Sequence, residues 1–244
     1  MRTWLCLAWL AMAGAGVTGQ AVPTDWIDRD TGHRVVRLTG ETGGSTLYFH
    51  DNAFSPEGNT LIVNTPGGIA KADVAAIGTA GASLTVVAPA ARSGYVARRA
   101  RDIYSGGRGG PIVATNLDTG KTREVAYARG LINADETLSV AKNGNAADPE
   151  GKYPAHPSGR SCRSCSECSP ARRCHQGRRA GVQADGTLTR ERLVNMSRHN
   201  YVTGRGGVEP NAHITPDKKW AIFTGQFAPG QRHVYAVQLD KSGQ

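Results

Sequence analysis

After its N-terminal residues, the chain lacks any apolar run that approaches the roughly 20 residues needed to cross a bilayer. Acidic residues are also scarce, with 20 Asp and Glu against 29 Lys and Arg. Cysteine is nearly absent outside one segment, because four of the five cysteines lie between residues 162 and 174. The first absence argues against a transmembrane helix in the mature chain. The last confines any cysteine chemistry to one short stretch.

The excess of basic residues is concentrated in one place. Residues 152–179 hold seven Lys and Arg and one acid, Glu167, so this segment supplies +6 of the net charge of +9 and leaves +3 elsewhere. A nucleic-acid-binding domain usually carries a basic patch on its folded surface. The remaining +3 is compatible with a small anionic ligand, and we expect neither a nucleic-acid partner nor a membrane partner.

The N-terminus has the layout of a secretory signal peptide. Arg2 gives a charged start, and an apolar stretch over residues 4–17 leads into small residues. This order of charge, short apolar run and small residues is typical of export signals. We therefore expect residues 1–21 to be removed and the mature protein to be periplasmic or secreted. A buried N-terminal helix is the alternative, and it is disfavoured by three glycines, Gly14, Gly16 and Gly19.

An internal repeat gives the strongest signal of fold. The sequence Phe54–Val63 is echoed by Ile214–Phe223, and each reads as an apolar residue, Ser or Thr, Pro, an acid, a turn and then a strand. A second pair of similar stretches, Ile112–Val125 and Val234–Gly243, reads as a strand that ends at Leu-Asp and a glycine-bearing turn. Pro and an acidic residue favour tight turns between antiparallel strands.

These units predict an all-β fold, a β-propeller of TolB-like four-stranded blades. Blades take roughly 40 to 50 residues each, so the chain has room for about four, which is the low end for a closed ring. We expect an incomplete propeller, with N-terminal blades over residues 22–147 and C-terminal blade sequence over 182–244. An unrelated β-sandwich is the alternative, because it also has short strands and many turns.

Residues 148–181 differ from the rest of the chain. They are rich in Arg, Ser, Cys, Pro and Gly and nearly free of Val, Ile, Leu and Phe, so we expect a disordered insert or a stretch read out of frame. Disulfides and a metal site are the alternatives for its cysteines, whose spacing is C-x2-C-x2-C-x5-C-H. The cysteines concerned are Cys162, Cys165, Cys168 and Cys174.

Two parts of the chain resemble oligogalacturonate lyases. The first part comprises Trp26–Asp28, Thr31–Leu38 and Leu47–Phe54, and the second comprises Arg192–Tyr201 and Glu209–His213. The resemblance implies ancestry in a family of seven-bladed propellers that cleave short galacturonate oligomers by β-elimination. It also implies a divalent cation, typically manganese, held mainly by histidines at the mouth of the central channel.

The resemblance and the repeat together select the site residues. Residues just before the Ser-Pro turn of a blade lie on its innermost strand, near the channel where ligands bind. We expect His50 and Asn52 to bind substrate there, and His213 to match a metal-binding histidine of the family. Asn211, two residues earlier, stands where a second metal ligand is expected, with both side chains on one face of a strand. His33 and His199 are expected in strand pairing or at the surface.

No catalytic base can be assigned, because the chain has no counterpart of the family's central blades. Three hypotheses follow. The first is a lyase acting on oligogalacturonate in pectin breakdown, and the second is a non-catalytic carbohydrate-binding or remnant propeller. The third, a small redox or metal protein that uses the cysteines, has little support in an exported chain.

Overall fold

The computed structural model describes residues 23–89, 91, 94–106, 111–126, 131–132, 139–140, 146–147, 176–182, 187–197, 199, 208–228 and 230–241. The described part is all-β apart from one short 3-10 helix, η1 (Val74–Ala76). The predicted signal peptide, the cysteines and residues 148–175 lie outside it. Residues 176–181, the end of the unusual segment, lie in the strand β14 (Gln176–Val182).

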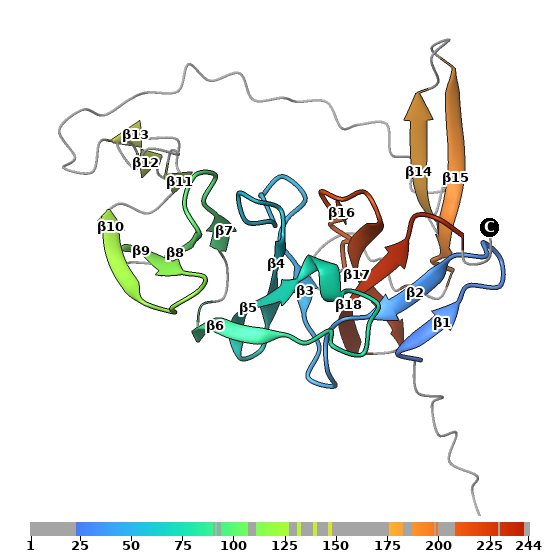
Figure 1. Cartoon of the computed structure of the whole chain (residues 1–244), viewed down its shortest axis with the longest axis horizontal. Helices are drawn as coiled ribbons and strands as arrows, with labels where there is room; N and C mark the ends of the chain where they lie inside the picture. The colour runs from blue at the N-terminus through green and yellow to red at the C-terminus, as the bar shows by residue number, and fades with distance from the viewer. Residues whose placement is uncertain are drawn as a thin grey trace, which may run out of the picture.

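One sheet contains both the first and the last of the described strands (Figure 1). Its order is β1-β2-β18-β17-β16, and we call it the terminal sheet. The N-terminal β2 pairs antiparallel with the C-terminal β18, with Val36 opposite Ala236. Its strands are β1 (Asp25–Ile27), β2 (Arg34–Arg37), β16 (His213–Ile214), β17 (Trp220–Ala228) and β18 (Gln231–Gln238).

Two further sheets are four-stranded meanders, in which each strand pairs with the next along the chain. The second sheet contains β3 (Ser45–Thr46), β4 (Thr60–Thr65), β5 (Gly68–Asp73) and β6 (Thr85–Pro89). The third sheet contains β7 (Gly94–Val96), β8 (Asp102–Gly106), β9 (Ile112–Asn116) and β10 (Thr122–Ala126). These meanders agree with the predicted four-stranded blades.

Two smaller sheets complete the described strands. One has the order β11-β12-β13, and the other is the pair β14-β15. The described sheets are separate and antiparallel, as in a propeller-like fold, and none of them closes on itself. The remaining strands are β11 (Leu131–Ile132), β12 (Ser139–Val140), β13 (Ala146–Ala147) and β15 (Leu188–Asn195).

The two Ser/Thr-Pro-acid turns of the repeat have closely similar hydrogen bonds. In the first, the Ser55 hydroxyl accepts from the amide of Thr60 at 3.2 Å, and the Gly58 amide donates to the Ser55 carbonyl at 2.8 Å. In the second, Thr215 plays the part of Ser55 and accepts from the Trp220 amide at 3.0 Å. The predicted turns are therefore present, and short polar side chains close them.

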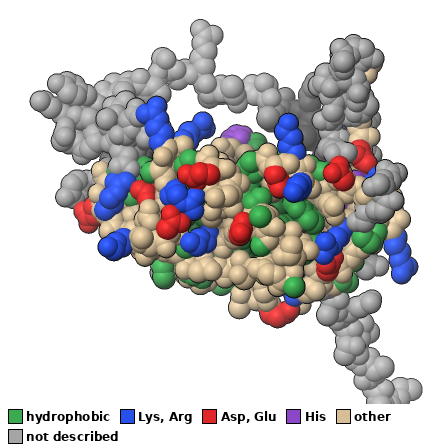
Figure 2. All heavy atoms as spheres, viewed as in Figure 1, with side chains coloured by type: hydrophobic (Ala, Val, Ile, Leu, Met, Phe, Trp, Pro, Cys, Tyr) green, Lys and Arg blue, Asp and Glu red, His purple; other side chains and the backbone are tan. Residues whose placement is uncertain are grey.

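The main hydrophobic core runs through all three large sheets. Ile222 of the terminal sheet, Ile62 of the second and Ile103 of the third belong to one cluster of buried side chains, and each is fully buried. On the face shown in Figure 2, Lys and Arg side chains are interspersed with Asp and Glu. Burial of this shared apolar surface is what holds neighbouring sheets together.

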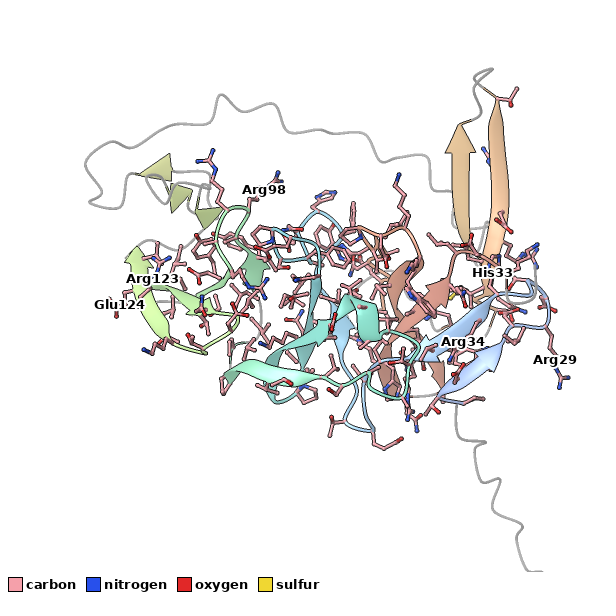
Figure 3. All side chains as sticks on the ribbon, viewed as in Figure 1. Arg29, His33, Arg34, Arg98, Arg123 and Glu124 are labelled. Atoms are coloured by element: carbon pink, nitrogen blue, oxygen red, sulfur yellow. The ribbon has the colours of Figure 1, made fainter. Side chains whose placement is uncertain are left out.

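A second core cluster docks β15 onto the terminal sheet. Leu193 and Val194 are buried there with Val35 and Tyr235. Beside it, His33 is fully buried, with Nδ1 2.8 Å from the Gln238 carbonyl and Nε2 3.2 Å from a Glu191 carboxylate oxygen of β15 (Figure 3). His199 is also buried, at 6% exposure, so neither histidine lies at the surface.

Candidate functional site

His213 opens β16, the last strand in the order of the terminal sheet, where it pairs with Ile222 of β17. Its side chain is partly buried, and its ring lies edge-on to Phe54 with the centroids 6.5 Å apart. Nε2 lies 3.1 Å from the carbonyl oxygen of Leu47, which directly follows β3 of the second sheet. His213 therefore lies where the terminal and second sheets meet.

This hydrogen bond fixes which nitrogen of His213 is available. A carbonyl oxygen can only accept, so Nε2 carries the proton and donates it to Leu47. In the neutral ring the lone pair is then on Nδ1. Burial lowers the pKa of His213, while the Leu47 carbonyl and Asp51 act in the opposite direction. The neutral form is favoured near neutral pH, and Nδ1 can ligate a cation or accept a proton.

The segment from Leu47 to Asn52, which we call the inner loop, follows the edge strand β3 of the second sheet. Thr46 pairs with Val63 of β4, and the next contact with that strand is the bridge between Phe54 and Leu61. Within the loop, the Asp51 amide donates to the Tyr48 carbonyl at 2.8 Å and closes a turn. The inner loop therefore projects from the strand at the place where His213 contacts it.

Asn52, predicted to bind substrate, uses its side chain to shape this loop. Its amide nitrogen donates to the Phe54 carbonyl at 2.7 Å, and its Oδ1 accepts from the Phe54 amide at 3.3 Å. Its own carbonyl accepts from Val96 of β7 at 3.3 Å. Asn52 thus ends the inner loop and links it to the third sheet.

His50, the other predicted substrate residue, is exposed on the inner loop. Its ring packs against Phe49 with a centroid distance of 3.8 Å and against Tyr48 at 5.1 Å. The next residue, Asp51, is half-buried, and burial raises its pKa while the charges of His213 and His50 act to lower it. Asp51 is therefore electrostatically coupled to both candidate histidines.

Sequence reasoning missed Asp51. The signal was present, because a carboxylate stands between His50 and Asn52 in the run His-Asp-Asn. A carboxylate next to a histidine raises the histidine's affinity for a proton and is a ligand for hard cations. Its proximity to His213 depends on the contact between two sheets, which local sequence does not reveal.

The backbone of Asn211 is not in the extended strand conformation that was expected. The strand β16 begins only at His213, and Asn211 lies before it with a φ of 41°, in the left-handed region. Asn is among the few non-glycine residues that adopt this region readily. Because Asn211 is not extended, the alternation of a strand does not place its side chain on the same face as that of His213.

The described side chains do not fit a resident manganese ion. Among the residues whose side chains the structure describes, no group of three His, Cys, Asp or Glu gathers where it could hold a metal. His213 offers one lone pair and Asp51 one carboxylate, whereas such ions usually take six ligands, mostly oxygens. We therefore derive no chemical step through a metal.

The architecture and this site define an all-β, propeller-like protein with a polar site where its terminal and second sheets meet. It is similar to the solved structure of an oligogalacturonate lyase in complex with manganese, at a TM-score of 0.60 and 13% identity, covering 89% of this chain and 96% of that one. An oligogalacturonate lyase from Vibrio parahaemolyticus matches at a TM-score of 0.60 and 11% identity, covering 90% and 97%. No family model matches the chain, and no curated protein matches its sequence.

The resemblance expected from the sequence is thus confirmed at the level of the fold. Identities of 13% and 11% carry no further statement about activity. In the part of the chain that the structure describes, no helix has the length and hydropathy of a membrane span.

Proposed function

We propose that the protein acts on short acidic oligosaccharides of the galacturonate type, and that its reaction is β-elimination. The observation that carries the proposal is the neutral His213 held against the inner loop, in a chain whose fold is similar to that of two oligogalacturonate lyases. The predicted signal peptide fits a periplasmic or secreted protein that meets such oligomers outside the cytoplasm.

The reaction needs a proton acceptor next to the uronate. A base removes the proton from C5, alpha to the carboxylate, the C4–O bond breaks, and a C4–C5 double bond forms as the departing oxygen takes up a proton. His213 has a lone pair on Nδ1 and a pKa lowered by burial, so it is unprotonated at neutral pH and can accept the C5 proton. We assign it this role, in place of the metal-ligand role that the resemblance implies.

A non-catalytic carbohydrate-binding propeller is the second candidate. It is favoured by the donor set at the site, where the described residues bring together fewer than three metal-binding side chains. It is also favoured by Asn211, whose amide is a weaker ligand than the imidazole expected at that position. Such a protein would bind the same oligomers and leave them intact.

One experiment separates the two candidates. Purified protein is mixed with digalacturonate, with and without manganese and with a chelator. Binding is measured by calorimetry, and the product by the ultraviolet absorbance of the unsaturated uronate. The matched variant is His213→Gln, whose amide can still donate to Leu47 but has no basic lone pair. We expect product from the wild type and a loss of at least about 100-fold in rate for His213→Gln, with binding retained.

The other outcomes are equally informative. Binding without product in the wild type under every condition identifies the non-catalytic protein. Equal rates for the wild type and His213→Gln rule out His213 as the base. The absence of both binding and product overturns the proposal.

A further inference from the structure

Two adjacent aromatic side chains of the inner loop are unusually exposed. Tyr48 is 47% exposed and Phe49 is 51% exposed, and His50 next to them is also exposed. Exposed apolar side chains that occur singly are common, but adjacent ones more often mark a binding surface. The other large hydrophobic side chains exposed in the described part are isolated along the chain, namely Ile27, Val86 and Ile214.

The three rings form one packed cluster, which we call the aromatic platform. The centroids of Tyr48 and Phe49 are 4.6 Å apart, those of Phe49 and His50 are 3.8 Å apart, and the rings are tilted by 50° and 70°. Such contacts restrict the rings without covering them. The platform therefore presents an ordered apolar surface to solvent.

The residues on either side of the platform, Leu47 and Asp51, both interact with His213, the candidate base. Leu47, just before Tyr48, accepts the hydrogen bond from Nε2 of His213. Asp51, just after His50, interacts electrostatically with His213. The loop that carries the platform therefore contacts His213 at its start and interacts with it electrostatically at its end.

We propose that the aromatic platform, Tyr48, Phe49 and His50, is the subsite that stacks against one sugar ring of the acidic oligosaccharide. This inference rests on the proposed function and adds the surface that recognises the substrate. A galacto-configured ring has an axial oxygen at C4 on one face, so the hydrogens of C3, C4 and C5 gather on the other. That apolar face packs on an aromatic ring, while the carboxylate and hydroxyls project from the edge towards polar groups.

The configuration at C4 determines which uronate the platform binds more tightly. In a gluco-configured uronate the C4 hydrogen points to the opposite face, so the apolar patch is smaller and contacts the rings less well. The platform therefore favours galacturonate over glucuronate oligomers of equal length and charge. Charge alone cannot produce this difference, because the two oligomers carry the same carboxylates.

The test measures binding of digalacturonate and of the corresponding glucuronate dimer by calorimetry. The proteins are the full wild-type chain, Phe49→Ala, Phe49→Trp and Ile27→Ala. Ile27 is 48% exposed on the edge strand β1 and serves as the matched control for loss of an exposed apolar side chain. All substitutions are at exposed positions, so the thermal midpoints should stay close to that of the wild type.

We expect Phe49→Ala to weaken digalacturonate binding about tenfold, and Phe49→Trp to stay within about twofold of the wild type. Ile27→Ala should bind like the wild type, and the preference for digalacturonate should shrink in Phe49→Ala. If the wild type and Phe49→Ala bind digalacturonate equally well, the proposed role of the platform is wrong, and the proposed function still holds. A wild type that binds neither dimer overturns the proposed function and the platform with it.

Discussion

The ring of Tyr235 stabilises the folded state, whereas its buried hydroxyl destabilises it. The residue is fully buried in β18, and its ring stacks on Phe223 at 5.7 Å and meets Phe227 edge-on at 4.9 Å. Within the described part of the chain its hydroxyl has no hydrogen-bond partner. A buried polar group without a partner costs free energy, because it has lost its bonds to water.

Replacing Tyr235 by Phe removes the hydroxyl and keeps the ring. We expect Tyr235→Phe to leave the free energy of unfolding unchanged or to raise it by about 1 kcal/mol at neutral pH, measured by chemical denaturation. Tyr235→Leu is the control, because it also lacks the hydroxyl but loses the ring contacts, and it should be less stable than the wild type. A Phe variant as unstable as the Leu variant would show that the hydroxyl has a partner.

The pKa of Tyr235 predicts how the stability of the protein changes at alkaline pH. Burial raises the pKa of Tyr235 to about 12, from 10.0, with the charge of Arg37 acting in the opposite direction. The folded state therefore keeps a proton that the unfolded state loses, so the stability present below pH 10 falls as the pH rises from 10 to about 12. Unfolding measured across this range should show a shallower decline for Tyr235→Phe. Parallel curves for the two proteins would refute this.

At the scale of elements, the two Ser/Thr-Pro-acid turns of the repeat touch one another. Gly58, in the turn of the second sheet, lies beside Pro216, in the matching turn of the terminal sheet. A Cβ added at Gly58 would lie 2.8 Å from the Cβ and Cγ atoms of Pro216. Because Gly58 also has a φ of 76°, both the backbone and the neighbouring turn require glycine there.

We expect Gly58→Ala to lower the free energy of unfolding by about 2 kcal/mol or more. The control is Gly120→Ala, at a glycine with a φ of 68° in a turn where an added Cβ meets nothing within 4 Å. That variant has the backbone strain alone, and it should lose about 1 kcal/mol. Equal losses in urea denaturation would mean that the Pro216 turn moves aside without cost.

The inner loop shows how one element makes a site. The strand β3 contains only two residues before the chain leaves the sheet, and pairing resumes at Phe54. A continuous strand would turn alternate side chains into the core. By leaving the sheet, the chain exposes Tyr48, Phe49 and His50 instead, in a loop whose first residue, Leu47, contacts His213.

At the scale of the whole molecule, the side chain of Arg101 links the second and third sheets. Arg101 follows the first strand of the third sheet and binds Asp118 through Nε and Nη2, at 2.8 and 2.9 Å. Its Nη1 reaches Glu57 in the turn of the second sheet at 2.6 Å. These carboxylates raise the pKa of Arg101, so it remains charged, and its planar group bridges two sheets.

Lysine cannot reproduce this bridge, because it has one nitrogen in place of three. We expect Arg101→Lys to lower the thermal midpoint by a few degrees at low ionic strength. The difference from the wild type should shrink in high salt, because salt screens these partly exposed charges. An unchanged midpoint at low salt would show that the shared core alone holds the second and third sheets together.

The local structure could be predicted from the sequence. The Ser/Thr-Pro-acid repeat predicted both turns and the strands on either side, and the resemblance to oligogalacturonate lyases predicted a fold that the solved structures support. These features were predictable because a turn is specified by a few neighbouring residues. His213 and the residues around His50 were also selected from sequence, and their roles remain predictions.

The tertiary structure alone decided how these parts meet. The pairing of β2 with β18 joins residues about 200 positions apart, and the hydrogen bond from His213 to Leu47 joins residues 166 positions apart. That bond places the proton of the neutral His213 ring on Nε2 and the lone pair on Nδ1. The φ of Asn211 takes Asn211 out of the extended strand conformation. Contacts between sheets depend on register and packing over the whole chain, so no local pattern could reveal them.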